Sequence, residues 1–413
     1  MLFKKSLLSP GSRPRIGALA GFLLVGVLAL SACTSGNTGN TTGNSGTGNS
    51  GQSSPAAPAV AVSIEPAKAT DISPTTPIVV KASNGTLTDV TVTNAAKGTK
   101  VTGTLSADKT TWTSKDVLGY GATYNVDAHA TDSSGKTVDQ QGNVTTLSPS
   151  KQANANLIPA PSAVAQTGVG VGQPIVFQFS YPVKNKADVE KQLSVKSNPP
   201  QEGSWYWIDD KNVHYRPKVY WQAGTTLTVT AKIYGVDFGN GVYGADDRTE
   251  TYHVHDSWIA KADGNTEQMQ IFHNGQMVNS LPISMGKDVT PTHLGPHVIS
   301  FKSPNYTMDS CTYGVCPPDP KAYRSDEKWS ERISNDGEFV HENPNSVGQQ
   351  GSSNVSHGCI NLNAQNAEWF FNNLGLGDVV EVTNSGGQQL PVWDLYGDWA
   401  LPWDQWQKGS ALN

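Results

Sequence analysis

The most constraining feature of this sequence is a series of short segments in which apolar and polar residues alternate. In the first half of the chain they include residues 60–65, 77–82, 86–93, 100–105, 123–131 and 136–146. Turn dipeptides such as Asn84-Gly85 and Ser134-Gly135 separate several of them. Successive side chains of a strand point to opposite faces of a sheet, so the alternation predicts strands. Many short strands joined by tight turns predict a β-sandwich, which we place at residues 58–148.

A weak internal repeat predicts a second module of this kind at residues 149–253. The stretch Pro77-Ile78-Val79-Val80 recurs there as Pro174-Ile175-Val176-Phe177. Neither module contains a cysteine, which excludes a disulfide of the antibody type. Trp205 and Trp207 are expected to pack in a core or an interface, with ligand binding as the alternative. We find no catalytic constellation in either module and expect both to act as spacers.

The composition agrees with a mainly β protein. Charged residues make up 15% of the 413 residues, whereas glycine (41) and proline (25) are frequent. This mixture favours turn-rich β structure over a helical bundle, and the length predicts about three domains. The formal net charge is −6 and no basic domain or stripe is present, so nucleic-acid binding is not expected.

One loop of the second module is a candidate cation site. Asp237, Asn240 and Gly241 offer side-chain and backbone oxygens within a tight turn. Oxygen ligands of this kind suit a structural Ca²⁺ ion. The spacing does not match an EF-hand loop, and a plain hairpin turn is the alternative that we favour.

The N-terminus predicts export and lipid anchoring. Basic residues precede an apolar run at residues 16–30, which is the layout of a secretory signal. The following Leu30-Ser31-Ala32-Cys33 resembles a bacterial lipobox, which implies a signal segment at 1–33 and a lipid on Cys33. An ordinary signal with a chance cysteine is the alternative. Residues 34–57 are rich in Gly, Ser, Thr and Asn, as in a flexible linker, so we expect an extracytoplasmic protein anchored to the outer face of the plasma membrane.

The number of cysteines points to one of them as a candidate nucleophile. The chain has four cysteines, and if Cys33 carries lipid an odd number remains in an oxidising compartment. Cys311 and Cys316 could pair with each other, which leaves Cys359. An unpaired thiol in an exported protein indicates either intermolecular pairing or a reactive nucleophile. Cys359 follows His357-Gly358, and His341 lies upstream, so the neighbourhood favours the nucleophile.

The second half of the chain is expected to be mostly β, with one short helix after the cysteine. Asn363 is a good N-cap, residues 364–374 include several apolar side chains, and Gly375 is a good C-cap. We place this domain at residues 254–383 and a C-terminal subdomain at 384–413. The subdomain carries Trp393, Trp399, Trp403 and Trp406, which we expect to pack against the catalytic domain and stiffen it.

The hexapeptide Ser356-His357-Gly358-Cys359-Ile360-Asn361, with His341 before it, resembles the signature of L,D-transpeptidases, which have a YkuD-type catalytic domain. The stretches 308–310, 312–314 and 397–399 resemble the actinobacterial branch of that family. That branch has a lipid or signal anchor, two Ig-like modules, the catalytic domain and a Trp-rich tail. The resemblance thus implies a mainly β fold in that order.

The resemblance also implies a division of catalytic roles. Cys359 is the nucleophile, His341 is its base, and the backbone carbonyl of Glu342 orients the imidazole. A free thiol with a pKa near 8.5 is mostly protonated at neutral pH, and a neighbouring histidine can take its proton. Backbone N–H groups around His357, Gly358 and Cys359 would form the oxyanion hole. No cofactor is required.

The implied substrates are peptidoglycan stem peptides, joined by 3→3 cross-links with release of D-Ala, and carbapenems are the implied inhibitors. The residues that match substrate-binding positions of the family are Met308, Tyr313, Tyr323, Asp336, Gly337, Ser356 and Asn361. Asp336 adds a charge near the donor site, and Asn345 stands where close relatives have Trp. Two alternatives remain open: an L,D-carboxypeptidase that uses water as acceptor, and a non-catalytic wall-binding lipoprotein.

Overall fold

The computed structural model describes residues 59–413. The predicted signal segment, Cys33 and the linker at 34–57 lie outside these residues, so lipid anchoring stays a prediction. Within residues 59–413, no helix is both long enough and apolar enough to cross a membrane.

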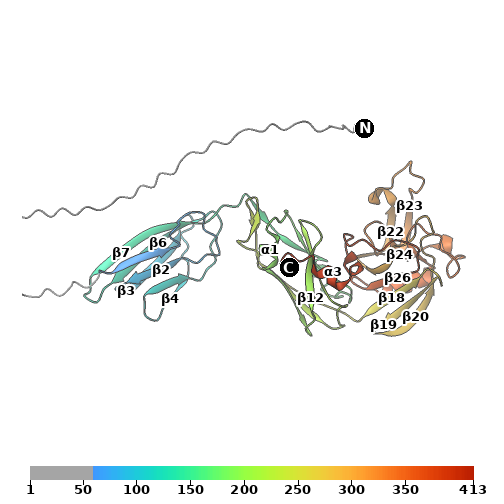
Figure 1. The fold of residues 1–413 in the computed structure, drawn as a ribbon, viewed down its shortest axis with the longest axis horizontal. Coiled ribbons are helices and arrows are strands. Elements are labelled where there is room, and N and C mark those ends of the chain that lie inside the picture. Colours follow the sequence, from blue (N-terminus) through green and yellow to red (C-terminus); the bar gives the residue numbers. More distant parts are fainter. Residues whose placement is uncertain (1–58) are drawn as a thin grey trace, which may run out of the picture. The chain divides into compact units, whose positions relative to one another are not determined.

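The first β module consists of two antiparallel sheets (Figure 1). Their strand orders are β1-β2-β5-β4 and β3-β6-β7. The strands are β1 (Ala61–Glu65), β2 (Val79–Ser83), β3 (Thr86–Asn94), β4 (Gly103–Leu105), β5 (Thr111–Ser114), β6 (Thr123–Thr131) and β7 (Thr137–Thr145). In β6 the side chains of Tyr124, Val126, Ala128 and Ala130 are buried and alternate with more exposed ones. The alternation in the sequence therefore forms one wall of this core.

The second module has sheets in the orders β12-β13-β10-β9, β11-β14-β17 and β15-β16-β8. Its elements are β8 (Lys151–Ala153), β9 (Ala155–Ile158), η1 (Pro161–Ala163), β10 (Ile175–Phe179), α1 (Lys186–Glu190), β11 (Leu193–Asn198), β12 (Gly203–Trp207), β13 (Asn212–Pro217), β14 (Thr226–Ala231), β15 (Asp237–Gly239), β16 (Val242–Gly244) and β17 (Arg248–His253). Trp205 and Trp207 are buried in its core beside Phe177 and Phe179, as the packing interpretation predicted.

Residues 237–244 form a β-hairpin, the alternative that we favoured for the candidate calcium loop. Asn240 and Gly241 both have positive φ (56° and 73°), as a tight hairpin turn requires. The Asp237 carboxylate accepts the Gly239 N–H at 2.7 Å. A turn therefore accounts for these residues, and nothing in the described part of the chain adds support for a bound cation there.

The third part of the chain has two sheets, in the orders β20-β19-β18-β26-β21 and β22-β23-β24-β25 (Figure 1). Its elements are β18 (Trp258–Asp263), β19 (Gln268–His273), β20 (Gln276–Pro282), β21 (Gly295–Val298), β22 (Phe301–Asp309), η2 (Ser310–Tyr313), β23 (Arg324–Arg332), β24 (Phe339–Glu342), η3 (Pro344–Ser346), β25 (Ile360–Leu362), α2 (Ala364–Asn373) and β26 (Val379–Thr383). Val340, Ile360 and Phe370 are buried in one core cluster, which holds β24, β25 and α2 together. The mainly β prediction is confirmed.

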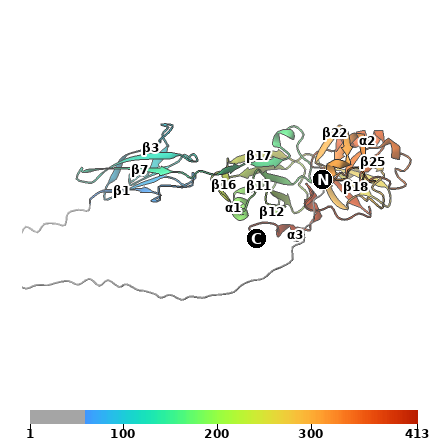
Figure 2. The same cartoon turned by 90° about the horizontal axis from the view of Figure 1, so that it is seen from above.

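The helix after the cysteine begins as predicted but ends differently. Figure 2 labels this helix, α2. Asn363 caps it, because its side chain accepts the Asn366 N–H at 2.9 Å. The C-cap is Leu374 in an extended conformation, not a left-handed Gly375, so the predicted glycine cap is wrong. The Gly375 N–H instead donates to the Asp378 side chain at 2.8 Å, and buried Leu374 packs into the core.

The Trp-rich tail, with η4 (Gly397–Ala400) and α3 (Trp403–Gln407), makes its main polar contacts with the second β module. The Trp406 indole N–H donates to the Ser204 carbonyl at 2.9 Å, and the Asp398 carboxylate lies 2.8 Å from His214 Nδ1. We predicted packing against the catalytic domain, and that prediction was incomplete. An aromatic cluster indicates burial but carries no information about which neighbour covers it.

Candidate active site

His341 and Cys359 are brought together by a parallel pair of strands. In the register of β24 and β25, Val340 pairs with Ile360 and His341 with Asn361. Cys359 immediately precedes β25, so it lies beside His341. Both side chains are largely buried (3% and 7% exposed), and they line the same pocket. The buried flanking residues Val340 and Ile360 anchor this arrangement in the core.

The hydrogen bonds of His341 prepare it to act as a base. Its Nδ1 lies 2.7 Å from the Glu342 carbonyl, which can only accept, so Nδ1 carries the proton in the neutral ring. Nε2 is then left to accept the proton of the Cys359 thiol. This matches the role that the resemblance implied for the Glu342 backbone.

A second group at His341 was not foreseen in the sequence. Glu327 on β23 places its Oε2 atom 3.3 Å from His341 Nδ1. Burial by itself would lower the pKa of His341, but hydrogen bonds to Cys359 and Glu327 raise it to about 10. No local motif marks Glu327, which is 14 positions before His341 in the sequence and reaches it across the sheet.

The loop before the cysteine is held by its own hydrogen bonds. Ser356 Oγ donates to the Cys359 carbonyl at 2.6 Å and accepts the Gly358 N–H at 3.0 Å. The Gly358 N–H, one of the groups expected around the oxyanion hole, is thus donated to Ser356 Oγ in this structure. The N–H groups of His357 and Cys359 are the remaining candidates from that prediction. The Cys359 Sγ lies 3.6 Å from the Gly337 carbonyl oxygen.

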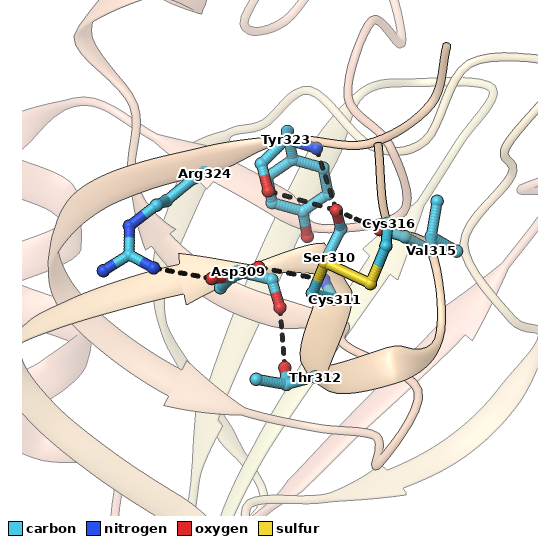
Figure 3. The surroundings of a disulfide bond; sticks show 8 residues. All are labelled: Asp309, Ser310, Cys311, Thr312, Val315, Cys316, Tyr323 and Arg324. Carbon is cyan, nitrogen blue, oxygen red and sulfur yellow. Dashed lines mark hydrogen bonds and ion pairs between the residues drawn. A yellow bond between two sulfur atoms is a disulfide. The ribbon is translucent and has the colours of Figure 1, made fainter. Parts of the chain in front are cut away.

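A disulfide braces the lid between β22 and β23 (Figure 3). Cys311 and Cys316 are bonded to each other, and Cys359 is the free cysteine of the described residues. Ser310 Oγ donates to the Val315 carbonyl at 2.7 Å and accepts the Tyr323 N–H at 2.8 Å. The disulfide and these hydrogen bonds tie together the stretch that carries the two predicted lid tyrosines.

Two adjoining pockets lie at and next to the cysteine. We call the first the cysteine pocket; it has a volume of about 320 Å³ and contains Cys359 and His341. We call the second the lid pocket; it has a volume of about 290 Å³ and lies under the lid. Tyr323 and His357 line both pockets, and their rings stack at 5.6 Å between centroids.

The predicted substrate residues divide between these two pockets. Those lining the cysteine pocket are Met308, Tyr323, Ser356 and Asn361. Those lining the lid pocket are Tyr313, Tyr323, Asp336 and Gly337. Asn345, one of the predicted departures from the family, is exposed at the cysteine pocket.

Gly337, just before the strand that carries His341, lies against Tyr313 of the lid. Its φ is 108°, and a Cβ at this position would lie 2.6 Å from the Tyr313 ring. A Gly337→Ala variant is expected to displace Tyr313 and to slow acylation of Cys359 by a carbapenem about 10-fold, the order expected for a misplacement of about 1 Å. Stopped-flow rates would measure this effect.

Gly386→Ala is the matched control for this prediction. Gly386 also has a positive φ (78°), but a Cβ there would have no neighbour within 4 Å. The control therefore introduces backbone strain without a collision with the lid. Equal acylation rates in the two variants would contradict the proposed contact.

The lid pocket is lined in part by a charged cluster that the sequence did not reveal. Glu338 is almost fully buried, with Oε1 3.0 Å from His293 Nδ1 and Oε2 3.3 Å from His297 Nε2. The hydrogen bond to Glu338 raises the pKa of His293 to about 9, so this imidazole balances the buried carboxylate. In residues 59–413, His293, Asp336 and Glu338 are the group whose ligand atoms lie close enough together to hold a metal ion. The ion pairs account for it without one.

A buried cysteine–histidine pair in a pocket is an arrangement typical of enzymes that transfer acyl groups through a thiol. The comparisons with known proteins agree: residues 257–382 match the L,D-transpeptidase catalytic domain, and residues 69–237 match a bacterial Ig domain. The chain is 40% identical to L,D-transpeptidase 2 of Mycobacterium tuberculosis, over 81% of each chain. It therefore belongs to the L,D-transpeptidase family. Members of this family are cysteine enzymes that work without a metal or cofactor.

Further relatives are similar over much of the chain. L,D-transpeptidase 5 of M. tuberculosis is 38% identical, over 83% of this chain and 75% of its own. A solved structure of an L,D-transpeptidase in complex with imipenem is 30% identical, covers 57% of this chain and 100% of its own, and has a TM-score of 0.49.

Proposed function

We propose that this protein forms 3→3 cross-links between peptidoglycan stem peptides through an acyl-enzyme on Cys359. The observation that supports the proposal is the lid pocket, which adjoins the cysteine pocket that holds the Cys359–His341 pair. Transfer between two peptides needs a site for a donor and a site for an acceptor. The two pockets share Tyr323 and His357, so two bound peptides would meet beside the thiol.

The first half-reaction follows from the hydrogen bonds at His341. Nε2 of His341 takes the proton of the Cys359 thiol, and the sulfur attacks the carbonyl carbon of the third residue of the donor stem. A C–S bond forms, and negative charge develops on the carbonyl oxygen. When the C–N bond to the terminal D-Ala breaks, His341 returns the proton to the departing amine. The product is a thioester on Cys359 and free D-Ala.

The second half-reaction reverses these roles. The side-chain amine of an acceptor stem attacks the thioester and gives a proton to His341, and the C–S bond breaks. The proton then returns to the thiolate, which restores the starting state. Water in place of the amine would give hydrolysis, the reaction of a carboxypeptidase. The two lid tyrosines, which line the lid pocket, would favour transfer if a bound acceptor stem excludes water from it.

The proposal extends to location and inhibition. We propose that a lipid on Cys33 anchors the chain to the outer face of the plasma membrane, where it faces the cell wall, and that carbapenems acylate Cys359. A Cys33→Ala variant is expected to leave the membrane fraction of the cell. If the variant stayed in that fraction, the lipid anchor would be wrong.

Product analysis on disaccharide-tetrapeptide fragments tests the reaction. The protein is expected to release D-Ala and to give dimers linked between third residues, identified by tandem mass spectrometry. Release of D-Ala with tripeptide and no dimer would instead show a carboxypeptidase. No reaction, with the fold intact by circular dichroism, would favour a wall-binding protein.

A further inference from the structure

We infer that Glu327 is a positioning residue for the Cys359–His341 pair, whose carboxylate holds the His341 ring and stabilises the imidazolium that forms when the thiol loses its proton. This inference rests on the proposed function and deepens it. It adds to the sequence-based expectation, in which the Glu342 backbone carbonyl was the sole partner of the histidine.

The sheet brings Glu327 to His341. Strands β23 and β24 are antiparallel neighbours, with Glu331 paired to Val340 and Arg332 to Phe339. Beyond these pairs β23 continues past the end of β24, and Glu327 faces the cysteine pocket there. Its Oε2 lies 3.3 Å from His341 Nδ1, and the side chains are 14% and 4% exposed. Because both groups are shielded from water, their attraction is screened much less than that of a surface pair.

The two acceptors at Nδ1 act on different states of the ring. The Glu342 carbonyl is the closer, at 2.7 Å, and it fixes the tautomer of the neutral imidazole. A carbonyl carries only a partial charge, whereas the Glu327 carboxylate carries a full one. The carboxylate therefore stabilises the charged ring more than the neutral ring. An ion pair of this kind favours transfer of the thiol proton to His341.

No other carboxylate in the described part of the chain lines the cysteine pocket. The titratable groups that share it with Glu327 are Cys359 before β25, Tyr323 at the lid and His357 before the cysteine. Burial raises the pKa of Tyr323, and burial followed by the nearby Lys287 lowers the pKa of His357, so both are uncharged at neutral pH. Glu327 itself is ionised, because its interaction with His341 outweighs burial and lowers its pKa.

Loss of the Glu327 charge is expected to lower the pKa of His341. With Glu327 ionised, His341 keeps its proton up to a pKa of about 10. If the carboxylate is replaced by a neutral amide, the imidazolium loses its nearest negative charge and releases its proton at lower pH. Opposite charges at such distances shift a pKa by about 1–3 units. Acylation requires the imidazolium as proton donor. As the pH rises, the acylation rate of the variant must therefore fall at a lower pH than that of the parent.

The test compares Glu327→Gln with Asp326→Asn. Asp326 is the adjacent exposed carboxylate, on the opposite face of β23, where it accepts a hydrogen bond from Thr307. Acylation of Cys359 by a carbapenem is followed from pH 5 to pH 11, and His341 is titrated by NMR. In Glu327→Gln we expect the pH at which acylation fails and the His341 pKa to fall by at least one unit from the parent value of about 10, which lowers the rate at least about 5-fold at pH 10 and much less at pH 8. Asp326→Asn is expected to match the parent.

Glu327→Asp keeps the negative charge, but its side chain is one methylene shorter, so the charge lies farther from His341. The pH at which its acylation rate falls should therefore lie between those of the parent and Glu327→Gln. Glu327→Asp also serves as the second test if Glu327→Gln does not fold. An unchanged His341 pKa in either folded Glu327 variant, or an equal loss of rate at every pH, would overturn the inference. If the parent protein itself forms no adduct, the failure lies with the proposed function, and the NMR titration still decides the role of Glu327.

Discussion

Replacing Cys359 with alanine is expected to abolish both the covalent carbapenem adduct and the cross-linking reaction, a loss of at least about 10⁴-fold. Alanine keeps the shape of the buried site but supplies no group that can form the thioester. Cys359 is only 7% exposed and packs in a small cluster with Met308 and Phe339, so the loss of one sulfur should leave the fold intact. Intact-mass spectrometry with and without a carbapenem measures the adduct directly.

The matched control is a variant in which both Cys311 and Cys316 are serine. It removes two sulfurs next to the lid pocket but leaves the nucleophile in place, so a single adduct should still form. If the adduct persisted in Cys359→Ala, another side chain would be the nucleophile. A parent protein that formed no adduct at all would shift the interpretation towards a wall-binding relative.

Replacing Arg216 with alanine is expected to destabilise the second module and the tail by about 4 kcal/mol, the order found when a buried, hydrogen-bonded charge is removed. Arg216 is 2% exposed. Its guanidinium lies 4.7 Å from the ring centroids of both Trp399 and Trp406, and it donates to the Leu401 carbonyl at 2.8 Å. Removal of the Arg216 side chain leaves a void between the two rings and leaves the Leu401 carbonyl without this hydrogen-bond donor. Urea unfolding followed by tryptophan fluorescence measures the change.

Arg248→Ala is the control for this effect. Arg248 lies in the same module, and its pair with Glu250 at 3.0 Å is about one-third exposed. Surface pairs of this kind contribute about 0–1 kcal/mol. Equal unfolding midpoints for the two variants would show that the tail does not depend on Arg216.

Much of the architecture followed from local patterns. The alternating segments became strands because one face of each sheet is buried, as in β6. The Asn363 cap formed because a side-chain oxygen three residues before a free N–H is a local arrangement. The end of the same helix was missed, because the Asp378 side chain and the burial of Leu374 overrode the preference for a glycine cap.

The sequence by itself predicted the candidate nucleophile, its candidate base and the order of the modules, because each prediction depends on residues close together in the chain or on a repeated local pattern. Only the tertiary structure decided that Glu327 reaches His341, that His293 balances Glu338, and that the tail binds Arg216. These contacts join residues on different strands or domains, and their existence depends on strand register and on which surfaces become buried. A charge or an aromatic ring in a sequence shows that a partner is needed, and folding alone selects the partner.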